Sequence, residues 1–223
     1  MNQEQALSLL KETKLVAILR GIPVKQATDI ATALYDGGVR VLEFTFDHDD
    51  PDCVAHNCQR IRAVKKIFGD EMVVGCGTAL TVQEVEASVE AGGQIVISPN
   101  VDVSVIAQSK ALGAISMPGA LTPTEIVMAY NAGADIVKLF PAGTLGVPYI
   151  KAVRGPLGYI PMSAVGGVRP ETIADFLNVG VCGFGVGGEL VKKEFVRSGD
   201  MNALTSRARK FVHAIEQWEA NRS

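Results

Sequence analysis

Two charged residues interrupt apolar runs of this 223-residue chain. Lys138 lies within ADIVKLF (134–140), and Glu43 lies within VRVLEFT (39–45). A charge inside an apolar strand is costly unless it is paired or neutralised. A lysine amine that burial keeps neutral can attack a carbonyl and form a Schiff base, and a neighbouring carboxylate can move protons. The alternative is a buried Lys–Glu ion pair that only fixes the strands, or side chains that point out between helices.

Two glycine pairs, Gly166-Gly167 and Gly187-Gly188, follow apolar runs in the last third of the chain. Glycine allows backbone N–H groups to approach an anion closely, so both pairs together predict a phosphate site. Arg20, directly after the apolar run 15–19, is placed to close that site. Simple turn geometry is the alternative explanation for either pair alone.

The run Asp47-His48-Asp49-Asp50 offers three carboxylates and an imidazole, which are ligands for a divalent cation. Consecutive residues rarely converge on one ion, and Asp50-Pro51 is explained as the start of a helix. We therefore expect no metal site. His56 and His213 fall on predicted helices and are expected at the surface.

Composition narrows the class of protein. Apolar residues make up 48% of the chain and charged residues 20%, which favours a large core over disorder. The net charge of −3 is spread along the chain, so we expect neither nucleic acid nor a membrane as partner. No apolar run approaches a membrane span, the N-terminus does not resemble a signal peptide, and the four cysteines lack ligand spacing. These features predict a cytoplasmic protein with free thiols.

The elements that position these residues follow a repeated pattern of helix, glycine, strand and loop. Thr81 with Glu84, and Thr122 with Glu125, form capping boxes that predict helix starts. Because eight such units follow one another without a linker, we predict an α/β fold, a (β/α)8 TIM barrel that forms one domain over 1–223. An extra helix is expected at 2–13 and the last helix at about 200–220. An open doubly wound sheet is the second choice, but no GxGxxG opens the first unit. The eight predicted strands are 15–19, 39–45, 72–77, 94–98, 114–117, 134–140, 160–165 and 181–186.

In such a barrel the active site lies at the C-terminal ends of the strands. That rule selects a set of candidate residues without any motif. They include Arg20, Glu43, Thr45, Asp47, residues 75–78 and 98–100, Pro118, Gly119, Lys138, Phe140, Pro141 and both glycine pairs. As site residues we select Arg20, Glu43, Thr78, Pro99, Lys138, Phe140, Gly166, Gly167, Gly187 and Gly188.

In order, VAILRG, the glutamate of VLEFT, GCGT, ISPN, MPGALTPTE, the lysine of ADIVKLFPA and AVGGV resemble the 2-keto-3-deoxy-6-phosphogluconate / 4-hydroxy-2-oxoglutarate aldolases over nearly the whole chain. The resemblance implies a class I pyruvate aldolase without metal or cofactor, usually a homotrimer. It implies that Lys138 is the Schiff-base lysine, Glu43 the general acid and base, and Thr78 a ligand of the pyruvyl carboxylate. It also implies that Arg20, Gly166 and Gly167 bind phosphate.

The sequence departs from the family pattern at two positions. The family usually reads E-x-T-x-R after the second strand, with an arginine that grips the substrate carboxylate, whereas this chain has Asp47 there. A relative that acts on the galactonate analogue has a neutral residue at this position. Where the family usually has a serine that donates to phosphate, this chain has Gly188, followed by Glu189. Both departures bear on the identity of the substrate.

We therefore expect an aldehyde-lyase that reversibly cleaves a 2-keto-4-hydroxy acid to pyruvate and an aldehyde. The leading substrates are 2-keto-3-deoxy-6-phosphogluconate and 4-hydroxy-2-oxoglutarate. One alternative is the same lysine chemistry on an unphosphorylated or non-standard keto acid. The other is a barrel that binds a metabolite without catalysis; Asp47 motivates it, and the presence of both Lys138 and Glu43 argues against it.

Overall fold

All eight predicted strands form, and a short additional strand follows the fifth. Pro118 separates β5 from β6, so the computed structural model, which describes residues 1–222, contains nine short strands where eight were predicted. A proline has no N–H to donate to a neighbouring strand, which explains the break. The strands are β1 (Leu15–Leu19), β2 (Val41–Thr45), β3 (Val73–Gly77), β4 (Ile95–Ile97), β5 (Ile115–Met117), β6 (Gly119–Ala120), β7 (Val137–Leu139), β8 (Met162–Val165) and β9 (Gly183–Val186).

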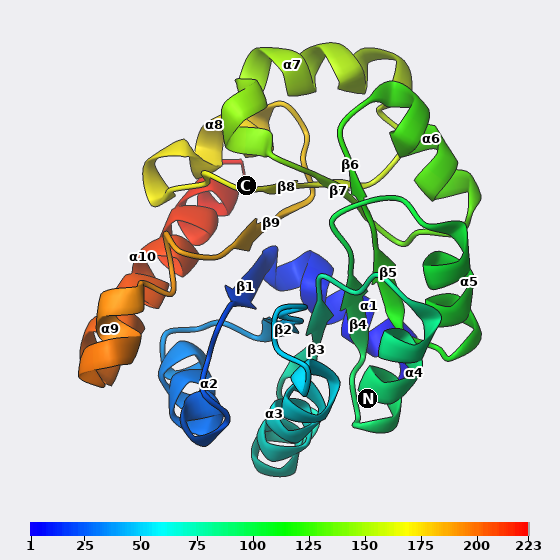
Figure 1. Cartoon of the computed structure of the whole chain (residues 1–223). Helices are drawn as coiled ribbons and strands as arrows, with labels where there is room; N and C mark the ends of the chain where they lie inside the picture. The colour runs from blue at the N-terminus through cyan, green and yellow to red at the C-terminus, as the bar shows by residue number, and fades with distance from the viewer. Residues whose placement is uncertain (223) are drawn as a thin grey trace.

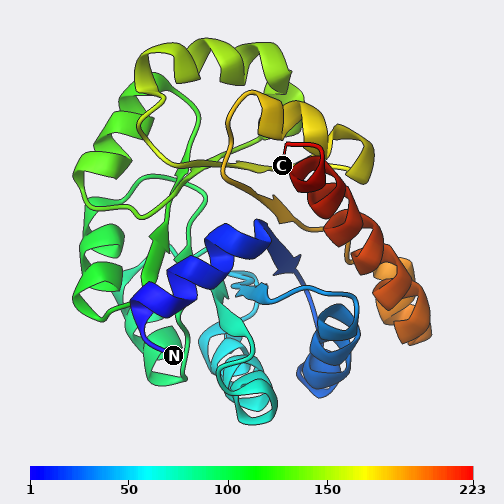
Figure 2. The ribbon, with the colours of Figure 1, turned by 180° about the vertical axis from the view of Figure 1, so that it is seen from behind.

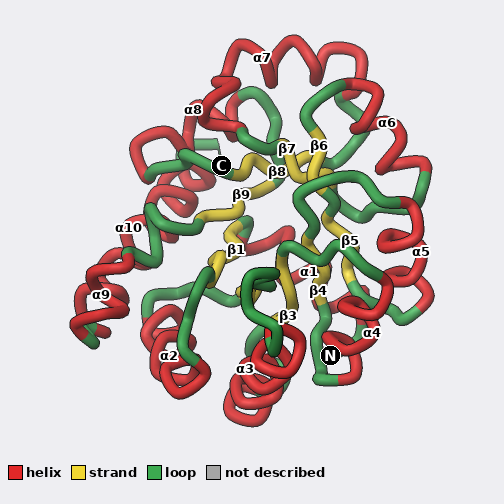
Figure 3. Tube along the Cα trace, in the orientation of Figure 1, coloured by secondary structure: helices red, strands yellow, loops and turns green. Residues whose placement is uncertain are grey.

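The strands pair in parallel in the order β5-β4-β3-β2-β1-β9-β8-β7-β6. The two ends of this order, β5 and β6, belong to one stretch of chain, so the sheet closes on itself. Across the closure the N–H of Asp135 donates to the carbonyl of Ser116 at 3.0 Å, and that of Lys138 donates to Pro118 at 2.9 Å. The strands form the inner ring and the helices the outer ring (Figures 1 and 3), which confirms the (β/α)8 barrel.

Apart from β5 and β6, successive strands are separated by helices along the chain, and many of these helices begin where the sequence predicts. Both predicted capping boxes form, Thr81 with Glu84 and Thr122 with Glu125. The helix after β2 begins at Cys53, slightly later than Asp50-Pro51 predicts. The helices and 3-10 turns are α1 (Gln3–Thr13), η1 (Val24–Gln26), α2 (Ala27–Asp36), α3 (Cys53–Phe68), α4 (Val82–Glu90), α5 (Val103–Ala111), α6 (Pro123–Asn131), α7 (Ala142–Leu157), η2 (Pro170–Thr172), α8 (Ile173–Asn178), α9 (Lys193–Ser198) and α10 (Met201–Ala220). Within residues 1–222, no helix is long and apolar enough to cross a membrane.

The extra N-terminal helix closes one end of the barrel. Figure 2 shows α1 lying across the end at which the strands begin. Its buried residues Ala6 and Leu10 join a cluster of apolar side chains from inside the barrel, including Val16, Val41 and Val73. This apolar plug leaves the opposite end, where the strands finish, as the open end of the barrel.

Side-chain alternation places the two candidate catalytic residues inside the barrel. In β2, Leu42 and Phe44 pack outward among the helices, whereas Val41 belongs to the interior plug. Successive strand residues point to opposite faces, so Glu43 points inward, one step closer to the open end than Val41. By the same argument Lys138 points inward, because its neighbour Leu139 packs outward.

Candidate active site

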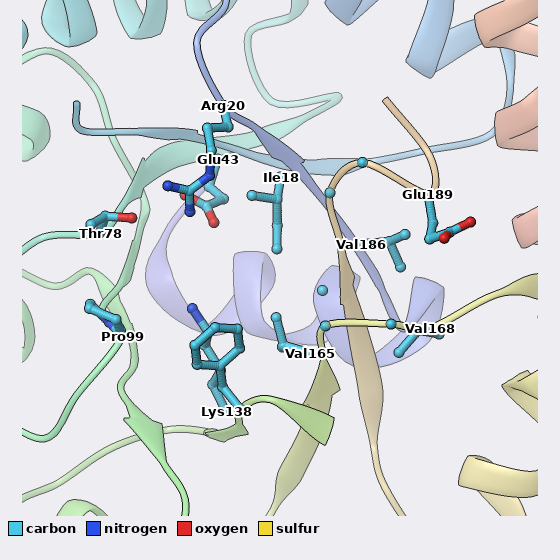
Figure 4. Close-up of a pocket in the computed structure, with 16 residues that line it drawn as sticks. Ile18, Arg20, Glu43, Thr78, Pro99, Lys138, Val165, Val168, Val186 and Glu189 are labelled. Atoms are coloured by element: carbon cyan, nitrogen blue, oxygen red, sulfur yellow. The ribbon is translucent and has the colours of Figure 1, made fainter. Parts of the chain in front are cut away.

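A cavity of about 410 Å³ lies at the open end of the barrel. All ten residues selected from the sequence line it, and the close-up in Figure 4 shows Lys138, Glu43, Thr78 and Arg20 converging on it. The cavity is therefore built from the ends of at least seven strands, as the barrel rule predicts. Its lining is Ile18, Arg20, Glu43, Thr78, Pro99, Lys138, Phe140, Val165, Gly166, Gly167, Val168, Gly185, Val186, Gly187, Gly188 and Glu189.

Lys138 and Glu43 are buried but do not form a salt bridge in the described structure. Lys138 is 7% exposed and Glu43 is 1% exposed. Burial lowers the pKa of Lys138, with the nearby Arg20 charge adding to the shift and Glu43 opposing it. A larger fraction of the lysine is therefore a free amine. No close ion pair holds the two groups. The alternative interpretation of the sequence, a buried Lys–Glu ion pair that only fixes the strands, is therefore not observed.

Glu43 has the properties of a proton carrier. Burial raises its pKa to about 7, and the charges of Lys138 and Arg20 only partly oppose that shift. Its Oε2 atom is buried and has no hydrogen-bond partner within residues 1–222. A carboxyl group with a pKa near the working pH can both accept and donate a proton. Glu43 lines the cavity, and its carboxylate is not held by a hydrogen bond to Oε2.

Thr78 follows β3 in a backbone conformation that threonine rarely adopts. Its φ is +57°, in the left-handed region that disfavours β-branched residues. The next residues hold it there: the N–H of Ala79 donates to Ile97 at 3.2 Å, and the N–H groups of Leu80 and Thr81 donate to Glu84 Oε2 at 2.6 and 3.0 Å. Figure 4 shows the Thr78 hydroxyl directed into the cavity.

The two glycine turns leave backbone donors free beside the cavity. Gly166 and Gly167 have φ values of +91° and +71°, which only glycine adopts without strain. Within residues 1–222, the N–H groups of Gly167 and Val168 donate to no protein acceptor, and neither do those of Gly188 and Glu189. Unpaired backbone donors in two adjacent turns are suited to bind an anion such as phosphate. Gly188 offers no side-chain hydroxyl, whereas the family usually has a serine at this position.

Asp47 and the residues after it do not join the cavity. Asp47 is exposed and lines a neighbouring hollow that includes Arg20 and Lys25. His48 contacts Glu84 at 2.7 Å, and Asp50 contacts His56 at 2.7 Å. The side chains of this loop therefore point to different partners, and no three metal-binding side chains converge anywhere in residues 1–222. His56 lies at the surface as expected, with its side chain 39% exposed, and its Nδ1 lies 2.7 Å from Asp50.

Sequence reasoning missed several residues that shape the cavity. Ile18 and Val165 form part of its apolar wall, and Glu189 lies at its edge. Gly77, which the sequence places at the end of the third strand, is not in the lining, but it leaves the space that the Glu43 carboxylate fills. Two signals in the sequence could have found them. The period of two along each strand places Ile18 on the same face as Val16, and the glycines of GCGT indicate a close approach to the neighbouring strand.

A buried amine and a protonatable carboxylate at the C-terminal mouth of a barrel form the arrangement that Schiff-base aldolases need. The family model described as "KDPG and KHG aldolase" matches residues 7–207. The chain belongs to this aldolase family.

Individual relatives agree with the family model. A "Probable 2-dehydro-3-deoxy-6-phosphogalactonate aldolase" of Rhizobium meliloti is 37% identical over 182 residues, which are 81% of this chain and 83% of that protein. The "KHG/KDPG aldolase" of Escherichia coli is 31% identical over 216 residues, 95% of this chain and 96% of that protein. A solved structure described as "Native KDPGal structure" superposes with a TM-score of 0.83 at 32% identity and covers 92% of this chain and 96% of its own.

Proposed function

We propose that this class I aldolase reversibly cleaves a 2-keto-3-deoxy-6-phospho sugar acid to pyruvate and glyceraldehyde 3-phosphate. The observation that carries the proposal is the pair Lys138 and Glu43, both buried in one cavity and not ion-paired with each other. The unpaired N–H groups of the two glycine turns support a phosphorylated substrate. Relatives at 37% and 35% identity carry the name of the galactonate compound, which favours that C4 epimer over the gluconate one.

The reaction follows from the positions of these groups. The neutral amine of Lys138 adds to the C2 carbonyl, and loss of water with uptake of one proton gives a protonated imine. The Glu43 carboxylate removes the proton of the C4 hydroxyl, the C3–C4 bond breaks, and its electron pair moves into the imine to give an enamine and the free aldehyde. The protonated Glu43 returns a proton to C3. Water then hydrolyses the imine, which releases pyruvate and restores the amine.

Trapping of the imine tests the proposal. Incubation with pyruvate and borohydride should reduce the Schiff base and add a stable group to Lys138, visible by mass spectrometry of the peptide. Lys138→Ala should give no adduct and no turnover, whereas Lys25→Ala, an exposed lysine outside the cavity, should react as the wild type does. Wild-type activity in Lys138→Ala, or an adduct on another lysine, would contradict the mechanism.

A comparison of substrates tests the phosphate. Both phosphorylated epimers and the unphosphorylated 4-hydroxy-2-oxoglutarate should be assayed, because a relative is named for both kinds of compound. We expect the largest kcat/KM for a phosphorylated acid, and competitive inhibition by inorganic phosphate. A higher kcat/KM for the unphosphorylated acid, with no effect of phosphate, would favour the alternative substrate.

We also propose that the protein is a cytoplasmic homotrimer. The family resemblance implies the trimer, and large apolar side chains such as Val103, Met128 and Tyr159 are exposed in the single chain and available for contact between subunits. The four described cysteines are all free, which suits a reducing compartment. Analytical ultracentrifugation should give a mass three times that of the chain; a monomer would contradict the proposal.

A further inference from the structure

The proposed substrate carries two anionic groups, and they must bind at different ends of the cavity. Its carboxylate is bonded directly to the carbon that Lys138 attacks, so it must lie beside Lys138 and Glu43. Its phosphate is at the far end of the carbon chain. The free N–H groups of the two glycine turns offer a site for one of the two anions without any side chain.

The cavity offers few cations for these two anions. Among its lining residues, the charged side chains are Arg20, Lys138, Glu43 and Glu189. Lys138 must be neutral to attack the substrate, so Arg20 is the permanent cation of this described set. Its guanidinium forms no salt bridge with any acid of residues 1–222, so its donors are available to a ligand. One guanidinium is therefore available to bind the substrate. The position of this guanidinium in the cavity decides whether it binds the carboxylate or the phosphate.

Figure 4 shows where that guanidinium lies. It extends over Glu43 and points toward Thr78, whereas Val186 and Glu189, which flank the second glycine pair, lie on the other side of Ile18. The charge of Arg20 acts on both Glu43 and Lys138, which agrees with a position close to the reacting groups. Arg20 is thus on the side of the cavity where the carboxylate must bind.

The residue at position 47, after β2, determines whether a second cation is available for the carboxylate. The family arginine expected there is replaced by Asp47, which is exposed and lies outside the cavity. Without Arg20, the Thr78 hydroxyl would be the polar side chain left for the carboxylate on that side of the cavity, and a single neutral donor binds an anion weakly compared with a guanidinium.

We propose that Arg20 and Thr78 bind the carboxylate of the substrate, and that the backbone N–H groups of the glycine turns bind the phosphate without a side-chain cation. The inference rests on the proposed function and revises the phosphate role that the family resemblance implies for Arg20. It makes Arg20 the residue that takes over from the arginine absent at position 47. A guanidinium also suits this task because its planar fork can donate two parallel hydrogen bonds to a carboxylate.

Pyruvate separates the two roles, because it has a carboxylate and no phosphate. The exchange of its methyl protons with deuterated water, followed by NMR, reports imine formation and proton removal. In Arg20→Met we expect the pyruvate concentration for half-maximal exchange to rise about 10- to 100-fold, the loss typical of hydrogen bonds between charged groups. The inhibition constant of inorganic phosphate against cleavage should stay within about twofold of the wild type, because the expected phosphate ligands are unchanged.

Two further variants control for folding and general charge. Lys25→Met removes an exposed cation next to Arg20 and should leave both measurements unchanged. Arg20→Lys keeps the charge but loses the two-pronged contact, so its effect on pyruvate should fall between those of the wild type and Arg20→Met; it also tests the proposal if Arg20→Met does not fold.

The outcomes that overturn the inference are distinct. If Arg20→Met weakens inhibition by phosphate and leaves pyruvate exchange unchanged, Arg20 is a phosphate ligand. If both change by the same factor, Arg20 acts only through its general field. If the wild type itself forms no adduct on Lys138 and exchanges no protons, the proposed function fails and the inference falls with it.

Discussion

The carboxylate of Glu43 occupies the space that a side chain at position 77 would need. A Cβ atom on Gly77 would lie 1.3 Å from Glu43 Oε2 and 2.1 Å from its Cδ. The general acid and base that we propose is therefore packed against the backbone of the neighbouring strand, with β2 and β3 paired so that Thr45 lies opposite Gly77. The absence of a side chain at this position of β3 leaves room for the carboxylate of β2.

Gly77→Ala tests this relationship. The added methyl group must displace the Glu43 carboxylate from the cavity, so cleavage should slow by about 10²–10⁴-fold, the usual contribution of a general acid or base. The pyruvate adduct on Lys138 should still form. Gly155→Ala in α7, where a Cβ meets nothing within 4 Å, is the control and should retain full activity. A folded Gly77→Ala protein with normal turnover would show that Glu43 does not need this position.

The pH dependence of proton exchange should reveal Glu43. Its pKa is raised to about 7 by burial, and only the ionised form can remove a proton from the pyruvate methyl group. At saturating pyruvate the exchange rate should therefore fall about tenfold per pH unit below pH 7. Glu43→Gln should be slower and should lose this inflection. If the inflection persists in Glu43→Gln, another group removes the proton.

The same pKa predicts a cost in stability. In the folded protein Glu43 keeps its proton up to about pH 7, whereas in the unfolded chain it ionises near its ordinary pKa of 4.5. Between these values the folded state binds more protons, so stability falls as pH rises through this window. Glu43→Gln removes the penalty. Its gain in melting temperature over the wild type should be larger at pH 8 than at pH 4, and an equal gain at both would contradict the raised pKa.

The sequence was sufficient for the barrel and for ten of the residues that line the cavity. Apolar runs, capping boxes and glycines repeat locally, and the rule for strand ends turned those positions into a site. Local pattern could not show that a further short strand, β6, follows Pro118, or that only Val137–Leu139 of the run 134–140 is strand. Nor could it show the contact of Glu43 with Gly77, because that depends on the register between two strands.

The direction of long side chains was also beyond the sequence. Arg20 follows β1, and the family resemblance implies that it binds phosphate; its guanidinium lies over Glu43 on the next strand (Figure 4). Asp47 stands where the family has an arginine that grips the substrate carboxylate, yet it lies outside the cavity. Both residues sit just past a strand end, where backbone position fixes neither the rotamers nor the path of the loop.

The strained backbone of Thr78 predicts that a glycine at this position makes the protein more stable but less active. Thr78→Gly relieves the unfavourable φ of +57°. The higher entropy of glycine in the unfolded chain offsets part of this gain, so the free energy of unfolding should rise by about 0.5–1 kcal/mol. The hydroxyl is lost, so half-maximal exchange should need more pyruvate. Thermal unfolding and the exchange assay measure the two effects. Lys14→Gly has the same φ far from the cavity and should leave exchange unchanged; a similar loss there would indicate a general effect.

Glu189 places a carboxylate beside the proposed phosphate site, and Arg207 holds it. The Arg207 Nε donates to the Glu189 carbonyl at 2.8 Å, and its Nη2 lies 3.5 Å from the Glu189 carboxylate. This contact from α10 fixes the turn that carries Gly188 and directs the acid away from the cavity (Figure 4). Arg207 thus reduces the repulsion between the Glu189 carboxylate and a phosphate bound at the neighbouring glycine turn.

Arg207→Met should release that acid. Its repulsion of the phosphate, screened because the Glu189 side chain is partly exposed, should raise KM for the phosphorylated substrate by about threefold to tenfold. Pyruvate exchange should not change, since pyruvate lacks the phosphate. Arg209→Met on the same helix, where the arginine contacts the carbonyl of Asp36 instead, is the matched control. The double variant Arg207→Met with Glu189→Gln should recover most of the affinity, because the repelling charge is gone. If the double variant is as weak as Arg207→Met alone, the arginine acts by holding the backbone of the turn and not by neutralising Glu189.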